Sequence, residues 1–277
     1  MRSTLLSPVE IRYAAFLILV GAILAAGCST RGSRITEPAD GAPAVAVDFD
    51  AIPEPEPREE PLSRYGNPPM YEVNGVSYRT LTSREGYVER GIASWYGTKF
   101  HGQRTSSGEP YDMYRVTAAH RSLPLPSFVR VTNLENGRKL VVRVNDRGPF
   151  HPNRIIDLSY AAAGKLGILG EGTGLVEVRA IDPRRPEPET RSAAAQRPGA
   201  PSLFVQVGAF ASRYNAESLR ERLQESLQRT VRIQEHAQPQ RPVYRVQVGP
   251  VETVESADRL TLRLADLGIR DVHVVVE

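Results

Sequence analysis

The sequence lacks the residue types on which several classes of protein depend. Its 277 residues contain one cysteine, so no disulfide can form within the chain and each domain must be stabilised by the apolar surface that it buries. There is one tryptophan, the net charge is only +3, and aromatic residues are not interleaved with the basic ones, so we expect no nucleic-acid site. The five histidines show no HExxH spacing or other compact ligand pair, so we expect no metal or other cofactor.

The N-terminal apolar run is too short for a comfortable membrane span. Residues 14–26 follow a positively charged start and end in small residues, as in a secretion signal. The chain's only cysteine, Cys28, comes directly after Gly27, and the four residues that end in Cys28 resemble a bacterial lipobox. We therefore expect residues 1–27 to be a lipoprotein signal peptide and Cys28 to carry the lipid that anchors the protein to an envelope membrane. The alternative is an ordinary signal peptidase site with an incidental thiol.

Two segments of the chain are too rich in proline and charge to form a core. The first covers residues 28–83 and includes the run Pro-Glu-Pro-Glu-Pro-Arg-Glu-Glu-Pro; the second covers residues 182–201. We expect both to be disordered, the first as a tether and the second as a linker. They divide the chain into a domain at residues 84–181 and another at residues 202–277, both of ordinary size.

The first domain shows short alternating strands and little helix. Two strand patterns, at residues 129–132 and 140–144, are joined by Asn136-Gly137, a strong signal for a hairpin. Only residues 159–166 are typical of a helix, with a serine as N-cap before an alanine-rich stretch. Many short strands with glycine turns favour a closed β-barrel, which leaves no exposed sheet edge.

The second domain is an internal duplication. The sequence Val-Gln-Val-Gly at residues 205–208 recurs at residues 246–249, and a helical leucine stripe follows each copy. Each half then returns to an alternating strand. The order βαββαβ predicts an α+β, ferredoxin-like domain with both helices on one face of the sheet.

The candidate chemistry lies in the first domain, at the ends of strands. Glu109, Asp146 and Asp157 are carboxylates beside turns, and His120 is a candidate hydrogen-bond partner or proton shuttle. Cleavage of a glycosidic bond needs an acid to protonate the leaving oxygen and usually a second carboxylate. The alternative is structural, because Asp146 begins an ordinary turn and Asp157 could simply pair with Arg147 or another neighbouring arginine.

A set of short motifs in this domain carries a resemblance to a known family. In chain order the motifs are Ala93-Ser94-Trp95-Tyr96-Gly97, Phe100-His101-Gly102, Gly108-Glu109, Thr117-Ala118-Ala119-His120, Val131-Thr132-Asn133, Asn136-Gly137, Asn145-Asp146-Arg147-Gly148-Pro149-Phe150 and Ile156-Asp157-Leu158-Ser159. The domain resembles the RlpA (rare lipoprotein A) family of septal lytic transglycosylases, which have a double-psi β-barrel. One small departure is Ser106, where the family more often has alanine.

The resemblance implies a reaction and assigns roles to residues. The bond between N-acetylmuramic acid and N-acetylglucosamine breaks as the muramic acid 6-hydroxyl attacks its own anomeric carbon, leaving a 1,6-anhydro end. The essential positions of the family fall on Glu109, His120 and Asp146. We expect Asp146 to act as general acid and then base and Glu109 as the second carboxylate, with the reverse assignment left open.

Four further residues have supporting roles in this interpretation. Arg147 neighbours the catalytic aspartate, and Asp157 is a candidate anchor for the turn before the helix. Trp95 and Tyr96 are candidates to stack on sugar rings, or alternatively to pack in the barrel core.

The second domain resembles the SPOR domain, a peptidoglycan-binding module. Residues 204–210 and 244–250 carry the resemblance, which implies binding of glycan strands that lack stem peptides. Strand alternation puts Gln206 and Gly208 on the same face of their strand, and it puts Arg245 and Gln247 on the same face of theirs. Gln206, Gln247 and Arg245 are therefore the candidate glycan contacts. The alternative is that these glutamines are merely solvated.

Together these features predict an endolytic lytic transglycosylase that acts on denuded peptidoglycan at the division septum. Ser29, directly after Cys28, is typical of lipoproteins sent to the outer membrane, so the expected location is the periplasmic face of that membrane. Proteins of the division machinery are further candidate partners. The rival interpretation is a non-catalytic, expansin-like protein that binds the wall without cleaving it.

Overall fold

The computed structural model describes residues 40–185, 201–236 and 242–277. The expected signal peptide at residues 1–27, Cys28 and most of the expected linker, residues 186–200, lie outside these ranges. Within the described residues, no helix has the length and apolar character needed to cross a membrane.

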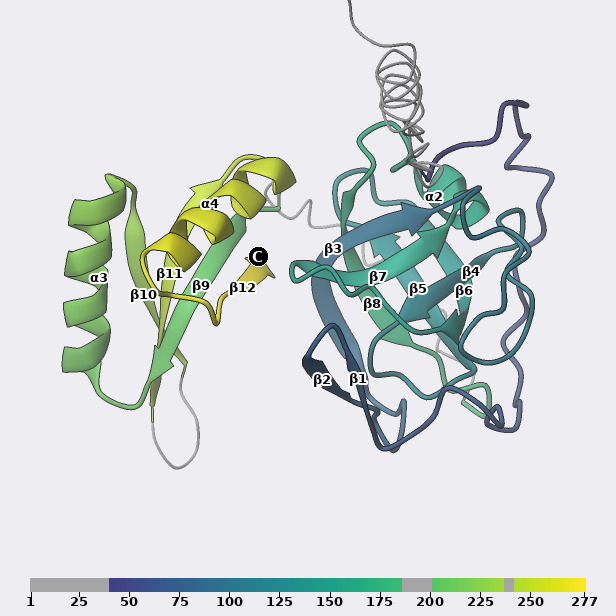
Figure 1. Cartoon of the computed structure of the whole chain (residues 1–277), viewed down its shortest axis with the longest axis horizontal. Coiled ribbons are helices and arrows are strands. Elements are labelled where there is room, and N and C mark those ends of the chain that lie inside the picture. Colours follow the sequence, from purple (N-terminus) through teal and green to yellow (C-terminus); the bar gives the residue numbers. More distant parts are fainter. Residues whose placement is uncertain (1–39, 186–200, 237–241) are drawn as a thin grey trace, which may run out of the picture. The chain divides into compact units, whose positions relative to one another are not determined.

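Six strands close into a barrel, as the sequence predicts (Figure 1). Their order around the barrel is β3-β7-β4-β6-β5-β8, with β3 parallel to β7 and β4 parallel to β6. The strands are β3 (Val88–Tyr96), β4 (Thr117–His120), β5 (Ser127–Asn133), β6 (Lys139–Asp146), β7 (Arg154–Ser159) and β8 (Gly174–Ala180). Closure pairs the backbone of every strand on both sides, so the barrel presents no edge to another chain.

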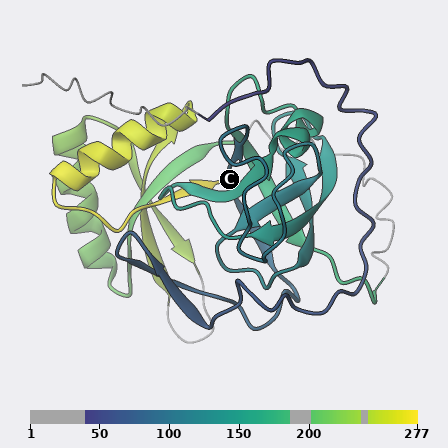
Figure 2. The ribbon, with the colours of Figure 1, turned by 45° about the vertical axis from the view of Figure 1, so that its right-hand side comes forward.

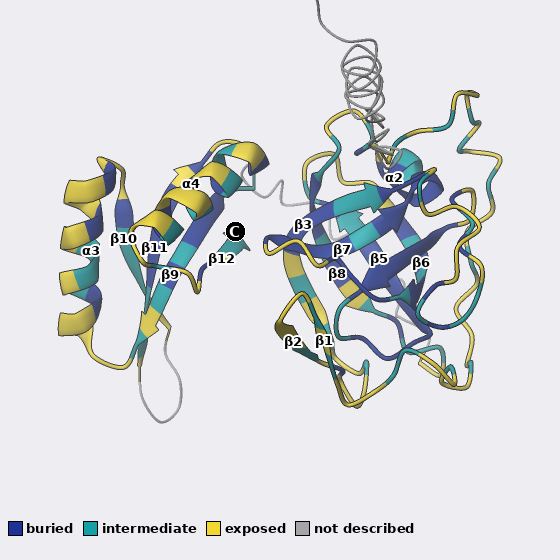
Figure 3. Ribbon diagram, viewed as in Figure 1, coloured by how far each residue is buried: buried dark blue, intermediate teal, exposed yellow. Residues whose placement is uncertain are grey.

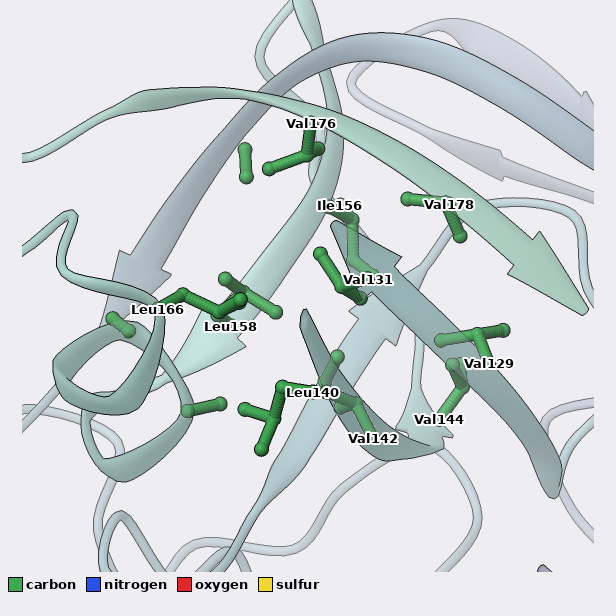
Figure 4. Packing of buried hydrophobic residues seen from close by; sticks show 14 of the residues in the cluster. Val129, Val131, Leu140, Val142, Val144, Ile156, Leu158, Leu166, Val176 and Val178 are labelled. Atoms are coloured by element: carbon green, nitrogen blue, oxygen red, sulfur yellow. The ribbon is translucent and has the colours of Figure 1, made fainter. Parts of the chain in front are cut away.

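Branched apolar side chains fill the barrel interior (Figure 4). They come from alternate positions of the strands, because successive side chains of a strand point to opposite faces. The inward set includes Val129, Val131, Leu140, Val142, Val144, Ile156, Leu158, Val176 and Val178, all at most 2% exposed. The interior is therefore a packed core, and the candidate chemistry must lie on the outside or at the ends of the barrel.

The predicted hairpin and helix are both confirmed. β5 and β6 pair antiparallel from Ser127 to Thr132, and Gly137 in their turn has a φ of 75°. Helix α2 (Tyr160–Leu166) begins at the N-cap Ser159, whose hydroxyl accepts a hydrogen bond from the Ala162 amide. The helix packs on β3, β6 and β7 and covers that side of the barrel.

Residues 40–83 differ from the disordered tether that their composition predicts. The segment runs in an extended form along the outside of the barrel (Figure 2). The Asp40 carboxylate accepts a hydrogen bond from the Gly97 amide, and the Phe49 ring lies 5.4 Å from that of Tyr160. Composition misled the prediction because the segment needs no core of its own; it uses the surface of the barrel.

The same segment contains a short hairpin that contacts the end of β6. Strands β1 (Met70–Val73) and β2 (Val76–Arg79) pair antiparallel, and the rings of Tyr71 and Tyr78 stack with their centroids 5.4 Å apart. The Phe150 ring lies 5.4 Å from that of Tyr78. The hairpin therefore packs on the loop that follows Asp146.

The second module has the predicted βαββαβ order. Its elements are β9 (Leu203–Phe210), α3 (Arg213–Leu227), β10 (Val231–His236), β11 (Val243–Val251), α4 (Val254–Asp266) and β12 (His273–Val276). The sheet order is β10-β11-β9-β12. Both helices turn their buried sides toward the sheet and their exposed sides away from it (Figure 3). This arrangement leaves one face of the sheet without a helix.

A bulge in β9 changes the expected side of one residue. Gln206 pairs with Gln247 and Gly208 pairs with Val246, so Val207 is an extra residue between the two pairs. A side chain at Gly208 would meet Leu219 of helix α3 at 3.4 Å, which places this position on the helix-covered face. The expectation that Gln206 and Gly208 share a face is therefore wrong, because simple alternation does not hold across a bulge.

We expect Ser159→Ala to destabilise the barrel. The buried hydroxyl accepts from the Ala162 amide and donates to the Arg115 carbonyl at 2.6 Å, so the substitution removes a helix cap and one of the two hydrogen bonds to that carbonyl. The free energy of unfolding should fall by about 1–2 kcal/mol. Urea denaturation, monitored by the fluorescence of the single tryptophan in β3, measures the free energy of unfolding of the barrel. An equal loss in the exposed control Ser77→Ala would contradict the assignment.

Candidate functional site

Four neighbouring strands align three polar side chains and one alanine in a row on the outside of the barrel. Ser94 of β3 pairs with Asp157 of β7, Asp157 pairs with Ala119 of β4, and Ala119 pairs with Asp146 of β6. Because adjacent strands lie ~4.8 Å apart, the two aspartates stand roughly 10 Å apart with one strand between them. Ala119, between them, is buried and lies close to Gly148 of the loop that follows β6.

A bulge in β6 turns Asp146 outward. Ala118 pairs with Val144 and Ala119 with Asp146, so Asn145 is an extra residue in the strand. Ala118 and Val144 belong to the interior core, whereas Ala119 packs in an apolar cluster on the outer side. The bulge therefore places a carboxylate on the outer face at the point where simple alternation would put it in the core.

One oxygen of the Asp146 carboxylate is held and the other is free. Its Oδ1 accepts hydrogen bonds from the Ser106 amide, the Ser106 hydroxyl and the Arg147 amide, each at 2.7 Å. Among the described residues, no hydrogen bond reaches Oδ2. Ser106, the departure from the family pattern, supplies one of the three bonds. The side chain is thus fixed in direction while one oxygen remains available to a ligand.

Glu109 is held as a carboxylate by Arg143. The Arg143 guanidinium donates to both Glu109 oxygens, at 2.8 and 2.9 Å, and the Asn145 amide donates at 3.0 Å. These bonds, Arg143 foremost, lower the pKa of Glu109 although partial burial opposes the shift. A side chain that is 40% exposed and firmly ionised is suited to stabilise positive charge rather than to deliver a proton.

Asp157 has the opposite tendency. Burial raises its pKa, and the neighbouring Asp146 charge adds to the effect, although the Ser94 hydroxyl donates to its Oδ1 and lowers the pKa. The three acids therefore differ in environment: Glu109 is paired with a cation, Asp157 is partly buried beside Ser94, and Asp146 is held by Ser106 and the Arg147 amide.

His120 is enclosed and does not join the row. Its ring is 2% exposed; Nδ1 accepts from the Ser122 and Leu123 amides, and Nε2 lies 2.8 Å from the Tyr87 hydroxyl. Tyr87 donates its single hydroxyl hydrogen to Glu89, so the His120 Nε2–H donates to Tyr87. Burial, reinforced by nearby arginines, lowers the pKa of His120 to about 3, which keeps the ring neutral.

Arg147 links segments that are far apart in the sequence. Its guanidinium donates to the carbonyls of Gly66, His120 and Leu123 and to the Asn67 side chain. The Nδ1 of His120 accepts a hydrogen bond from the Leu123 amide and so helps to hold the turn at residues 120–123 that Arg147 contacts. Arg147 therefore anchors the loop after Asp146 and is not free to bind a ligand.

Trp95 and Tyr96 contribute to packing. The half-buried Trp95 ring lies edge to face on Tyr160 at 5.7 Å, and the Tyr96 ring stacks on Tyr111 at 4.1 Å. The Tyr96 hydroxyl is buried and has no hydrogen-bond partner among the described residues. Of the two alternatives for these rings, the structure favours core packing over sugar stacking.

Several residues that shape this face received no role in the sequence analysis. Ser94, Ser106 and Arg143 each bond one of the acids, and a strand-pairing register would have indicated Ser94 and Arg143. Glu60, which also bonds Arg143, carried no signal because it lies in the expected tether. Across the described ranges, no group of three or more His, Cys, Asp and Glu side chains gathers as a metal site would require.

In the second module, the candidate contacts share the sheet face that no helix covers. Gln206 pairs with Gln247, and Arg245 stands two residues from Gln247 on the same strand. Gln247 is already engaged, because the Nε of Arg232 donates to its side-chain oxygen at 2.9 Å. The Arg232 guanidinium also lies 3.4 Å above the Phe204 ring. Arg232 and Phe204 are thus further members of this face, which the sequence analysis did not name.

Fold and site together define a class of envelope protein: a double-psi β-barrel with acids on its outer face, followed by a SPOR domain. The family described as "Lytic transglycolase" matches residues 88–179, and the SPOR domain family matches residues 200–274. The chain belongs to the RlpA family, as its similarity to named relatives shows.

Two of these relatives are both named endolytic peptidoglycan transglycosylase RlpA. The protein of Pseudomonas aeruginosa strain UCBPP-PA14 is 38% identical over 297 residues, which cover 88% of this chain and 86% of the relative. That of Vibrio cholerae is 48% identical over 184 residues, 65% of this chain and 70% of the relative. The solved SPOR domain of RlpA from P. aeruginosa is 27% identical, with a TM-score of 0.25, and covers 26% of this chain and 96% of its own.

We expect His120 to remain neutral in the folded protein well into the acid range. An unfolded histidine has a pKa of about 6.5, so between about pH 6.5 and pH 3 the unfolded chain binds a proton that the folded chain does not. This contribution therefore makes the folded state less stable as the pH falls through that window. The ring signals in NMR spectra should not titrate over it, and stability in His120→Gln should lose this part of its pH dependence. A midpoint near that of an ordinary histidine would contradict the assignment.

Proposed function

We propose that this protein is an endolytic lytic transglycosylase that cleaves the bond between N-acetylmuramic acid and N-acetylglucosamine. The observation that carries the proposal is the presence of two carboxylates, from neighbouring parts of the barrel, whose hydrogen-bond partners differ. Asp146 has a free oxygen, and Glu109 is held ionised by Arg143. Membership of the RlpA family supports the same reaction.

Asp146 is the proton carrier in this mechanism. Its protonated carboxyl group, through Oδ2, donates to the glycosidic oxygen, and the bond from that oxygen to the muramic acid C1 breaks. The 6-hydroxyl oxygen of the same sugar then bonds to C1 and returns its proton to Asp146. Atoms balance without water, and the product carries a 1,6-anhydro ring.

Glu109 and Asp157 have different tasks from Asp146. Glu109, ionised because Arg143 lowers its pKa, stabilises the positive charge that develops at C1 and the ring oxygen. Asp157, whose pKa burial raises, holds Ser94 in the row by accepting its hydroxyl hydrogen bond. His120 acts indirectly: it shapes the turn that holds Arg147, and Arg147 anchors the loop after Asp146. The reverse assignment of Glu109 and Asp146 loses support because a bidentate ion pair holds Glu109 unprotonated.

The second module directs the barrel to its substrate. We infer that its open sheet face, with Gln206 and Arg245 at the surface and the buried Gln247 holding Arg232 between strands, binds glycan strands that lack stem peptides, and that such strands at the division septum are the substrate. A lipid on Cys28 would hold the protein at the periplasmic face of the outer membrane, where proteins of the division machinery are candidate partners. Binding by one module raises the local concentration of glycan at the other.

We expect the protein to release 1,6-anhydromuramyl ends from peptidoglycan stripped of stem peptides. Asp146→Asn should lower the rate by at least about a hundredfold, because it removes the proton carrier, and Glu109→Gln by about a hundredfold, because it removes the stabilising charge. Mass spectrometry of the products measures both. Glu72→Gln, on the exposed β1 strand, is the matched control and should keep full activity.

Other products would decide between the rival functions. Binding without cleavage would identify an expansin-like wall binder. Ends heavier by one water would identify a hydrolase, because they show that water and not the 6-hydroxyl attacks C1.

Removal of residues 202–277 should lower the rate on long denuded strands by roughly tenfold or more, since the barrel then loses a tethered binding module. The barrel strands pair only with one another, so its unfolding transition should change little. The enrichment of the truncated protein at the septum, measured by fluorescence microscopy, should also decrease. An unchanged rate together with unchanged location would refute the role of the second module.

A further inference from the structure

The segment before the barrel forms one side of a cavity beside Glu109. The cavity has a volume of about 210 Å³. Residues Ile52, Pro53, Glu54 and Pro55 line one side, and Glu109, Tyr114, Arg115, Val116, Thr117 and Arg143 line the other. A segment expected to be a tether therefore meets the candidate catalytic face at the position of one of its acids.

Glu60 shares the arginine that holds Glu109. Both Glu60 oxygens lie 3.2 Å from the Arg143 Nε, and one accepts from Nη2 at 2.6 Å. The Glu109 oxygens accept from Nη1 and Nη2 of the same guanidinium. Arg143 is thus clamped between two carboxylates, and both the Arg143 and Glu60 side chains are about 15% exposed. This partly buried clamp fixes the direction in which Arg143 presents Glu109 to the cavity.

A second contact anchors the wall of the cavity. The Glu54 carboxylate accepts a hydrogen bond from the Val141 amide at 3.2 Å. On β6 the pairing with β4 begins only at Arg143, so the Val141 amide lies beyond the end of that pairing. Pro53 and Pro55, on either side of Glu54, stiffen the chain and need no backbone donor bond. The wall is therefore held at Glu54 and at Glu60.

The chemistry of the lining fits an uncharged ring with many hydroxyl groups. The exposed Tyr114 ring and the prolines offer apolar surfaces to the C–H groups of a sugar, and the charged side chains offer hydrogen bonds. Three carboxylates at or behind the lining, Glu54, Glu60 and Glu109, are balanced in number by the guanidiniums of Arg58, Arg115 and Arg143. The cavity therefore carries no excess charge, which suits an uncharged sugar ring.

We propose that this cavity is a saccharide subsite that binds one N-acetylated hexosamine unit of a denuded glycan strand, with Glu60 as the residue that positions Arg143. The proposal rests on the proposed function for the identity of the strand. It adds residues 52–60 to the binding site.

The test compares initial rates of the full chain on denuded glycan strands. Glu60→Gln should raise KM about tenfold, the size expected for one lost charge-assisted hydrogen bond, with kcat much less affected. Glu60→Asp keeps the charge and should recover part of the loss, which a merely structural role would not predict. Glu56→Gln, an exposed position of the same segment, is the matched control and should match the unaltered protein.

A structural measurement tests the subsite independently of turnover. Crystals of Asp146→Asn grown with a tetrasaccharide of alternating N-acetylglucosamine and N-acetylmuramic acid should show a sugar ring between Pro55 and Glu109. A ring there would support the subsite even if the unaltered protein gave no anhydro products, which would defeat only the proposed reaction. Sugar bound elsewhere on the barrel, or a Glu60→Gln variant with the KM of Glu56→Gln, would overturn the proposal. A higher rate for the Glu60→Gln variant would also overturn the proposal, since it would show that residues 52–60 block the substrate instead of binding it.

Discussion

The pairing of Ala119 with strands on both sides is the constraint on which the candidate site depends. Ala119 faces Asp157 on β7 and Asp146 on β6, so closure of the barrel alone sets the spacing of the two aspartates. No loop has to be ordered to bring them together. The apolar cluster of Tyr96, Tyr111, Met113 and Tyr160 packs against Ala119 and stabilises the strands that carry the row. The acids are therefore preorganised on a rigid scaffold.

Two arginines connect this row to the rest of the chain. Arg147 joins the loop after Asp146 to the Gly66 carbonyl, and Arg143 joins Glu109 to Glu60. Arg143 lies in β6 and Arg147 directly follows it, and both reach residues more than 75 positions earlier. The segment before the barrel is therefore part of the first module, although its composition alone would assign it to a tether.

The sequence predicted those features that depend on local pattern. Strand alternation, the Asn136-Gly137 turn and the Ser159 cap gave the barrel and its helix, and the internal repeat gave the second module. It could not predict features that depend on register: the bulges at Asn145 and Val207 reverse a face without any local signal. Nor could it predict that a proline-rich segment docks, because the docking surface belongs to another part of the chain.

The burial of the titratable groups explains how the roles are divided. His120 is neutral because its ring is enclosed, and Glu109 is ionised because an arginine donates to both of its oxygens. Neither can change its protonation cheaply near neutral pH. The proposed reaction therefore assigns proton transfer to the aspartates of the row. Of these, only Asp146 combines three hydrogen bonds on one oxygen with a second oxygen that no hydrogen bond from the described residues reaches. In the proposed reaction, the fold thus selects the proton carrier by fixing the charge of its competitors.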